Sequence, residues 1–187
     1  MFCVVVRDVY GVAVSSSRLY VVHWLSSYIS VYDVAMNYKQ LKYIELNGLV
    51  VDGEGSALRD IVVCSETQQL FASDWRNERV IRLTVDDSSQ SPVVEVLIQL
   101  DFRPYTMSIR VKRLLITPDP GMQHSETGYD SLRVYDIVSR QLVQSVPLAS
   151  HVTTWHAVET QRKTFVVCQR GREDNRQHNE VRECKLT

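Results

Sequence analysis

A set of short strands recurs along this 187-residue chain at intervals of 44 to 54 residues. The clearest copy has predicted strands at 60–64, 69–74, 79–85 and 93–100, each rich in β-branched or aromatic residues and bounded by polar turns. No run of ten or more residues shows an apolar period of 3.6, so the chain is predicted to be all-β.

The other units align with this copy. Second strands match at one position and third strands at another, with separations of 51, 44 and 50 residues and of 49, 54 and 47 residues. These positions are Leu19, Leu70, Leu114 and Thr164 in the second strands, and Val31, Val80, Val134 and Val181 in the third. Units of four strands repeating every 40 to 50 residues are typical of β-propeller blades. We therefore expect a β-propeller of four-stranded antiparallel blades, with units at 8–46, 57–100, 103–148 and 151–187.

The strand count leaves two arrangements open. Three full units give 12 strands and the last gives three, so residues 1–7 would supply a strand to a closing or a neighbouring blade. The chain would then form either a four-bladed ring closed by its two ends or part of a larger ring, such as one of six blades. In both cases the blades must stack, because a single blade cannot cover its own faces.

Composition narrows the function classes. Hydrophobic residues make up 44% of the chain, and 21 basic residues against 22 acidic ones leave a net charge of −1. This balance argues against a dedicated nucleic-acid or membrane surface. The four cysteines are far apart and form no CxxC pair, which favours a reducing, cytoplasmic setting.

No cofactor or catalytic constellation is predicted. Gly53 and Gly55 lie in a Gly-rich connection that lacks the Lys and the following helix of a phosphate-binding loop. The five histidines do not have the spacing of usual zinc clusters, and no Gly-x-Ser-x-Gly elbow is present.

The second unit resembles the NHL-repeat family. Its strand ends at Asp74, Asn77 follows in the turn, and Arg79 and Val80 open the next strand, as in the family pattern. The resemblance implies that Asp and Asn bond the turn backbone while Arg bridges to a carboxylate. It also implies six blades, and a context after RING, B-box and coiled-coil segments in ubiquitin ligases of the TRIM type. None of those segments is in this sequence.

Loops that join second to third strands, together with the blade junctions, share one face of a propeller and would carry the contacts to a partner. We expect a non-enzymatic scaffold that binds a protein there, because Trp, Tyr and Arg are common interface anchors. The alternatives are single-stranded RNA, which also suits Arg and stacked aromatics, and a lactonase-like metal-dependent hydrolase with Asp60 as an inward acid. The candidate contact residues are Trp75, Arg76, Arg79, Tyr105, Arg170 and Arg172.

Overall fold

A computed structural model describes residues 8–24, 26–46, 56–84, 92–119, 121, 131–148, 152–160, 164–173 and 176–184. These residues form fifteen antiparallel strands and no helix. No helix among them could therefore cross a membrane. The predicted strand within residues 1–7 lies outside the described residues. The chain divides into two compact units, Met1–Gln99 and Leu100–Thr187.

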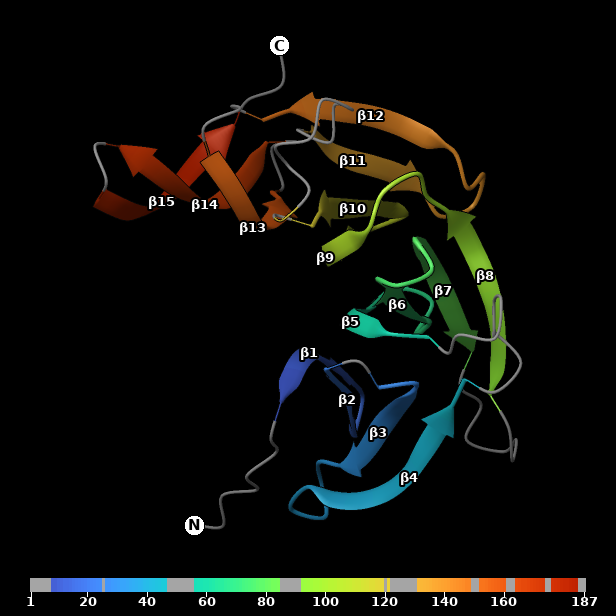
Figure 1. Ribbon diagram of the computed structural model, residues 1–187. Helices are drawn as coiled ribbons and strands as arrows, with labels where there is room; N and C mark the ends of the chain where they lie inside the picture. Colours follow the sequence, from blue (N-terminus) through green and yellow to red (C-terminus); the bar gives the residue numbers. More distant parts are fainter. Residues whose placement is uncertain are drawn as a thin grey trace. The chain divides into compact units, whose positions relative to one another are not determined.

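The first unit contains two four-stranded sheets, shown from blue to yellow-green in Figure 1, which we call blades 1 and 2. Their strands follow sequence order across each sheet. Blade 1 consists of β1 (Val9–Ser15), β2 (Arg18–His23), β3 (Tyr28–Asp33) and β4 (Lys39–Glu45), and blade 2 of β5 (Leu58–Val63), β6 (Leu70–Asp74), β7 (Arg79–Thr84) and β8 (Val93–Gln99).

The second unit contains a four-stranded sheet, blade 3, and a three-stranded sheet, blade 4. Blade 3 consists of β9 (Pro104–Arg110), β10 (Arg113–Pro118), β11 (Ser131–Asp136) and β12 (Leu142–Pro147), and blade 4 of β13 (Val152–Glu159), β14 (Phe165–Glu173) and β15 (Arg176–Cys184). The all-β class and the four-stranded antiparallel sheets confirm the predicted fold class.

Blades 1 and 2 share one apolar core. Alternate residues of β1 to β4 face blade 2, because side chains in a strand point to opposite faces in turn. The core contains Ala13, Tyr20, Val22, Ile29, Val31, Ile44, Leu46, Leu58, Ile61, Leu70, Ala72, Ile81 and Leu83. β1 and β5 approach so closely that a Cβ on Gly11 would lie 2.8 Å from the Asp60 Cα and from the Ile61 nitrogen.

Blades 3 and 4 pack in the same manner. Their core joins Leu115, Leu132, Val134 and Val146 of blade 3 to Ala157, Phe165 and Val167 of blade 4. An ion pair also connects the blades, with Arg113 Nη1 3.0 Å from Glu159 Oε1.

Fifteen of the sixteen predicted strands are confirmed, with ends that differ by up to a few residues. The exception to this agreement in strand ends is the last hairpin. Arg170 and Arg172 were expected in a loop between the second and third strands of the last unit, but β14 continues to Glu173 and β15 begins at Arg176. The polar composition of this segment suggested a loop, whereas backbone pairing such as Arg170 opposite Asn179 extends the ladder.

The first strand of every blade carries a bulge near its start. The register shifts between Val9 and Gly11 in β1, between Leu58 and Asp60 in β5, and between Thr154 and His156 in β13. In β9 the shift leaves Tyr105 and Thr106 opposite Thr117. A bulge adds one residue to a strand and re-aims its side chain. The extra residues are Tyr10, Arg59 and Trp155, with Tyr105 in the corresponding part of β9.

Candidate functional site

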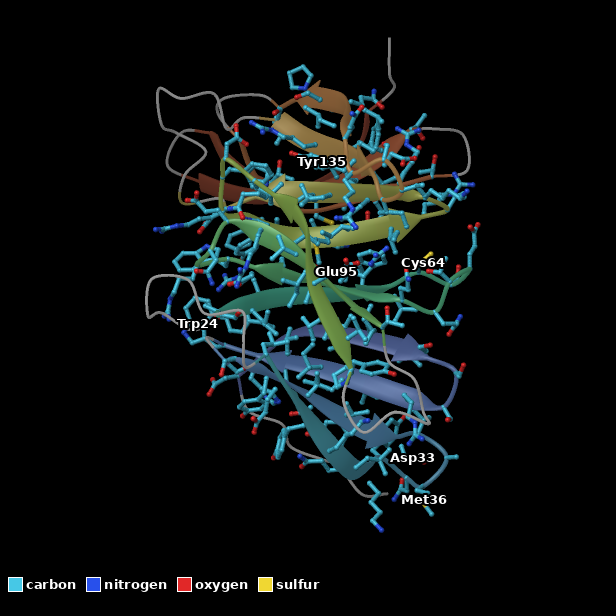
Figure 2. The ribbon with its side chains drawn as sticks, turned by 90° about the vertical axis from the view of Figure 1, so that its right-hand side faces the viewer. Trp24, Asp33, Met36, Cys64, Glu95 and Tyr135 are labelled. Carbon is cyan, nitrogen blue, oxygen red and sulfur yellow. The ribbon has the colours of Figure 1, made fainter. Side chains whose placement is uncertain are left out.

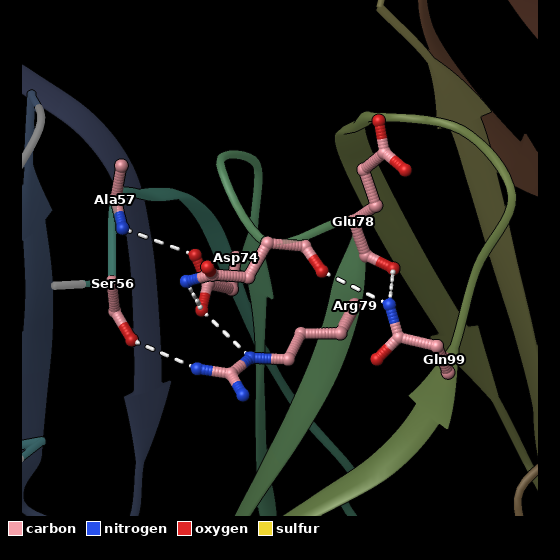
Figure 3. Close-up of polar contacts among 7 residues, drawn as sticks. Ser56, Ala57, Asp74, Glu78, Arg79 and Gln99 are labelled. Carbon is pink, nitrogen blue, oxygen red and sulfur yellow. Dashed lines mark hydrogen bonds and ion pairs between the residues drawn. The ribbon is translucent and has the colours of Figure 1, made fainter. Parts of the chain in front are cut away.

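The turn between β6 and β7 is held by one buried carboxylate (Figure 3). Asp74 is fully buried, and its Oδ2 accepts hydrogen bonds from Arg79 Nε at 2.9 Å and from Asn77 Nδ2 at 2.8 Å. Its Oδ1 accepts a hydrogen bond from the Ala57 backbone N–H at 3.0 Å. The Asp, Asn and Arg of the motif therefore bond to one another at the turn.

Two further contacts fix this turn. Arg79 donates to Ser56 Oγ at 3.4 Å, and Gln99 Nε2 donates to the backbone oxygens of Asn77 and Glu78, each at 3.1 Å. The Arg79 side chain is only 5% exposed. Its contacts place this candidate contact residue inside the turn and not on an exposed surface.

Trp75 and Arg76 lie at the tip of the same turn. Arg76 is exposed and Trp75 is half-buried. The Trp75 ring centroid lies 6.4 Å from that of Trp24, at an interplanar angle of 49°. Trp24 follows the end of β2, so the corresponding turns of blades 1 and 2 bring their tryptophans together.

The Trp24 ring also stacks on Tyr10, the bulge residue of β1. The two centroids are 4.5 Å apart and the planes are 24° from parallel. The Arg59 guanidinium carbon lies 4.2 Å from the Tyr10 centroid and 4.4 Å from the Trp24 centroid, within cation–π range. We call Tyr10, Trp24, Arg59 and Trp75 the Trp24 patch.

The Trp24 patch lies at one end of the first unit. Figure 2 shows Trp24 at the opposite end of blade 1 from Asp33 and Met36. Tyr10 and Trp24 remain 43% and 40% exposed despite their mutual stacking. The Trp24 backbone N–H donates to the Asp8 oxygen at 2.9 Å, which ties the loop after β2 to the start of β1. The rings of the Trp24 patch can stack on planar or apolar groups of a ligand, and the Arg59 guanidinium can donate to hydrogen-bond acceptors.

The second unit has a smaller aromatic pair. Tyr105 of β9 and Trp155 of β13 meet edge to face, with centroids 5.8 Å apart and planes 64° from parallel. Thr106 Oγ1 donates to the Trp155 backbone oxygen at 2.9 Å and lies 2.7 Å from Thr117 Oγ1. Trp155 is 38% exposed.

The remaining candidates, Arg170 and Arg172, lie in β14 and not in a loop, opposite Asn179 and Gln177. Their side chains lie outside the described part of the structure. The structure thus joins Trp75 to neighbours that sequence reasoning did not select, namely Tyr10, Trp24 and Arg59. The sequence feature that could have pointed to Tyr10 and Arg59 is a large side chain that recurs near the start of each first strand.

Few of the described side chains are arranged for catalysis or metal binding. His23 Nε2 lies 3.0 Å from the hydroxyl of Ser30, which is buried. Burial lowers the pKa of His156 and favours its neutral form. Within the described ranges, no group of three or more His, Cys, Asp or Glu residues could hold a metal ion.

Comparison with known proteins gives the fold. No family model matches the sequence, and no curated protein matches it. Among solved structures, the chain is similar to Kuenenia stuttgartiensis hydrazine synthase, with 17% identity, a TM-score of 0.65, and coverage of 89% of this chain and 45% of that one. It is also similar to the Cps50 (Swd1) beta-propeller domain of Myceliophteria thermophila, with 10% identity, a TM-score of 0.59, and coverage of 89% and 52%.

A third similar structure is the computationally designed Ika4 protein, with 12% identity, a TM-score of 0.60, and coverage of 96% of this chain and 91% of that one. The chain spans about half the length of the two natural proteins. At these identities the likeness concerns fold alone. With its all-β blades, the chain is a partial β-propeller of four-stranded antiparallel blades.

Proposed function

We propose that this chain is a non-enzymatic interaction module that binds a protein partner through the Trp24 patch and Arg76. One observation carries the proposal. Three aromatic rings and a guanidinium gather at one end of the first unit, and Tyr10 and Trp24 remain about two-fifths exposed.

This composition suits a protein interface. Trp, Tyr and Arg are the residues that most often dominate binding energy, because they combine large apolar area with a polar group. Mutual stacking also holds the rings in place before a partner arrives, which lowers the entropy cost of binding. Acidic Asp8 and Glu78 lie in the same region as Arg59 and Arg76, and this mixed charge favours a protein over a polyanion.

A quantitative capture experiment tests the proposal. The wild-type chain and the double variant Trp24→Ala, Trp75→Ala are used as baits, and the captured proteins are quantified by mass spectrometry. Loss of two side chains that dominate binding is expected to reduce the captured amount of specific partners tenfold or more. Each factor of ten corresponds to about 1.4 kcal/mol of binding free energy.

The matched control is Met36→Ala. Met36 is 60% exposed and lies at the other end of blade 1, so its removal should leave capture unchanged. Equal capture by wild type and the double variant would contradict the proposed surface. Adding Arg76→Ala to Trp75→Ala tests the tip of the β6–β7 turn separately.

Single-stranded RNA is the second candidate partner, and the cation–π contacts of Arg59 favour it. Arginine and aromatic planes together form platforms on which unpaired bases stack. RNA binding would weaken with salt and with Arg59→Ala or Arg76→Ala, as measured by fluorescence anisotropy of a labelled single-stranded oligonucleotide. No saturable binding at low salt would exclude this candidate.

The NHL resemblance belongs to the same proposal. The bond from Arg79 to the Asp74 carboxylate is the one that the motif implies, which supports an NHL-like blade. Asn77 donates to the Asp74 side chain, whereas the motif implies a bond to the turn backbone. We also propose a reducing, cytoplasmic location, which the wide spacing of the four cysteines favours.

The lactonase-like hydrolase is an alternative from another class. It would need Asp60 together with further inward ligands for a divalent ion. Asp60 Oδ1 accepts the Ile61 backbone N–H at 2.8 Å, a contact that stabilises the bulge of β5. A stoichiometric divalent ion in metal analysis of the purified chain would favour the hydrolase over the interaction module.

A further inference from the structure

The three rings of the Trp24 patch are held in place by one another and by the backbone beneath them. Trp24 stacks on Tyr10 with centroids 4.5 Å apart, and Trp75 is inclined to Trp24 by 49° at 6.4 Å. The backbone N–H of Trp24 donates to the Asp8 oxygen at 2.9 Å, and that of Trp75 donates to the Ala57 oxygen at 3.0 Å. The ring faces are therefore positioned before a ligand arrives, and they suit a ligand that presents flat apolar groups.

The polar groups of the patch are mainly hydrogen-bond donors. The indole N–H groups of Trp24 and Trp75 only donate, and the Arg59 guanidinium has N–H donors and no acceptor. The Tyr10 hydroxyl can both donate and accept. Tyr10 and Trp24 are 43% and 40% exposed, and Arg59 and Trp75 are half-buried. A ligand that complements this patch offers acceptors between its apolar groups.

The position that a ligand cation would take beside the rings is already filled. The Arg59 guanidinium carbon lies 4.2 Å from the Tyr10 centroid and 4.4 Å from the Trp24 centroid. Clusters of aromatic rings bind quaternary ammonium groups and methylated lysines through cation–π contacts. Such a ligand would have to displace a cation that belongs to the chain itself. The geometry therefore favours an uncharged apolar group on the rings.

Two common ways of binding a protein segment fit the patch poorly. Strand addition requires a regular sheet edge, but Tyr10 and Arg59 are the bulge residues at which strand pairing is interrupted. An amphipathic helix requires a row of apolar side chains along a groove, whereas the patch combines three rings with a guanidinium. A third way, docking of a proline-rich segment on aromatic side chains, matches this composition.

We infer that the Trp24 patch binds a proline-rich segment in the polyproline II conformation. Proline supplies an apolar ring and has no backbone N–H. A polyproline II helix has no internal hydrogen bonds, so its carbonyl oxygens remain available as acceptors. These are the two features that the rings and donors of the patch complement. The inference rests on the proposed function, because it states which kind of segment of a protein partner the patch binds.

The first test is binding of fluorescein-labelled decaproline to the wild-type chain, followed by fluorescence anisotropy. Saturable binding is expected, with an affinity at least about tenfold above that of a labelled Gly-Ser peptide of the same length, which lacks both the rings and the fixed conformation. Salt should change the affinity little, because pyrrolidine rings carry no charge. No saturable binding of decaproline, or equal binding of the two peptides, would overturn the inference.

Single substitutions connect this binding to the patch. Trp24→Ala and Trp75→Ala should each weaken decaproline binding about tenfold, since each removes a ring face. The matched control is Tyr38→Ala, which removes a 46% exposed ring from the turn between β3 and β4. Met36 of that turn lies at the opposite end of blade 1 from Trp24, so this variant should bind as wild type does. Wild-type affinity in both tryptophan variants would place the binding elsewhere and overturn the inference.

A competition separates this inference from the proposed function. Excess unlabelled decaproline is added to the wild-type bait of the capture experiment, and the Gly-Ser peptide serves as control. Decaproline should reduce tenfold or more those partners that the wild-type chain captures and the Trp24→Ala, Trp75→Ala variant does not. If these partners stay bound, the proposed function stands and the inference falls. If the double variant captures as wild type does, the proposed function falls, whatever decaproline does.

Discussion

At the residue scale, the Asp74 side chain holds the turn between β6 and β7 together. Its buried carboxylate accepts three hydrogen bonds, one of them from the buried Arg79 guanidinium. Arg79→Met should lower the free energy of unfolding by about 3–5 kcal/mol, because it leaves a buried charge without its partner. Urea denaturation measures this loss.

The control for that substitution is Arg82→Met in the same strand. Arg82 pairs with Glu95, but both side chains are partly exposed, at 26% and 35%. Exposed ion pairs contribute about 0–1 kcal/mol, so this variant should be nearly as stable as wild type. Equal losses for the two variants would mean that burial of the Asp74 pair is not what stabilises the turn.

His156 gives a prediction of pH dependence. Burial lowers its pKa in the folded chain below the ordinary value of 6.5, so the unfolded chain binds the proton more readily. This contribution lowers stability as pH falls through 6.5 towards the folded pKa. Urea midpoints at several pH values should therefore decline less steeply for His156→Asn than for wild type. Parallel declines would show that another group is responsible.

At this scale the sequence predicted some of the side-chain contacts and missed others. The bond from Arg79 to a nearby carboxylate follows from a local motif and was expected. The bond from Asn77 to the Asp74 side chain was not, because the motif implied that Asp74 and Asn77 would bond the turn backbone. The contacts of Ser56 with Arg79 and of Ala57 with Asp74 could not be expected, because Ser56 and Ala57 come from another part of the blade. Arg59 was missed for the same reason: its contact with Tyr10 spans 49 positions and forms only when two blades stack.

At the scale of the element, Gly11 controls how closely β1 approaches β5. A Cβ there would lie 2.8 Å from backbone atoms of Asp60 and Ile61, which cannot turn aside as a side-chain end could. Gly11→Ala should therefore cost about 1–3 kcal/mol through overpacking. In Gly121→Ala the new Cβ would lie 3.3 Å from the Asp119 carboxylate, the one near contact among the described residues, so thermal unfolding should change little. Comparable losses would contradict the packing explanation.

The strands were largely predictable because period-2 alternation and polar turns are local signals. The last hairpin was not, since β14 and β15 continue through a polar segment whose pairing does not depend on apolar side chains. The bulges were not predicted either, because a register shift depends on the partner strand. Yet these bulges bring Tyr10 and Arg59 into the Trp24 patch.

At the scale of the whole molecule, the repeat implies that stability is built from blades and from contacts between neighbouring blades. Sequence spacing predicted this architecture, because every unit contributes the same pattern. It could not identify which of the alternating residues of β1 join the shared core, since Ala13 on one face and Val12 and Val14 on the other are all apolar. The structure distinguishes them by the exposure of Val12 and Val14.

Phe165 tests this modular stability. It is fully buried and belongs to the core that blade 4 shares with blade 3. Phe165→Ala should remove about 3–5 kcal/mol from that core. Hydrogen exchange followed by mass spectrometry should then show faster exchange in β9 to β15, while β1 to β4 keep their protection, because nearest-neighbour contacts limit how far the loss extends. Equal acceleration in all fifteen strands would show instead that the chain unfolds as one cooperative unit.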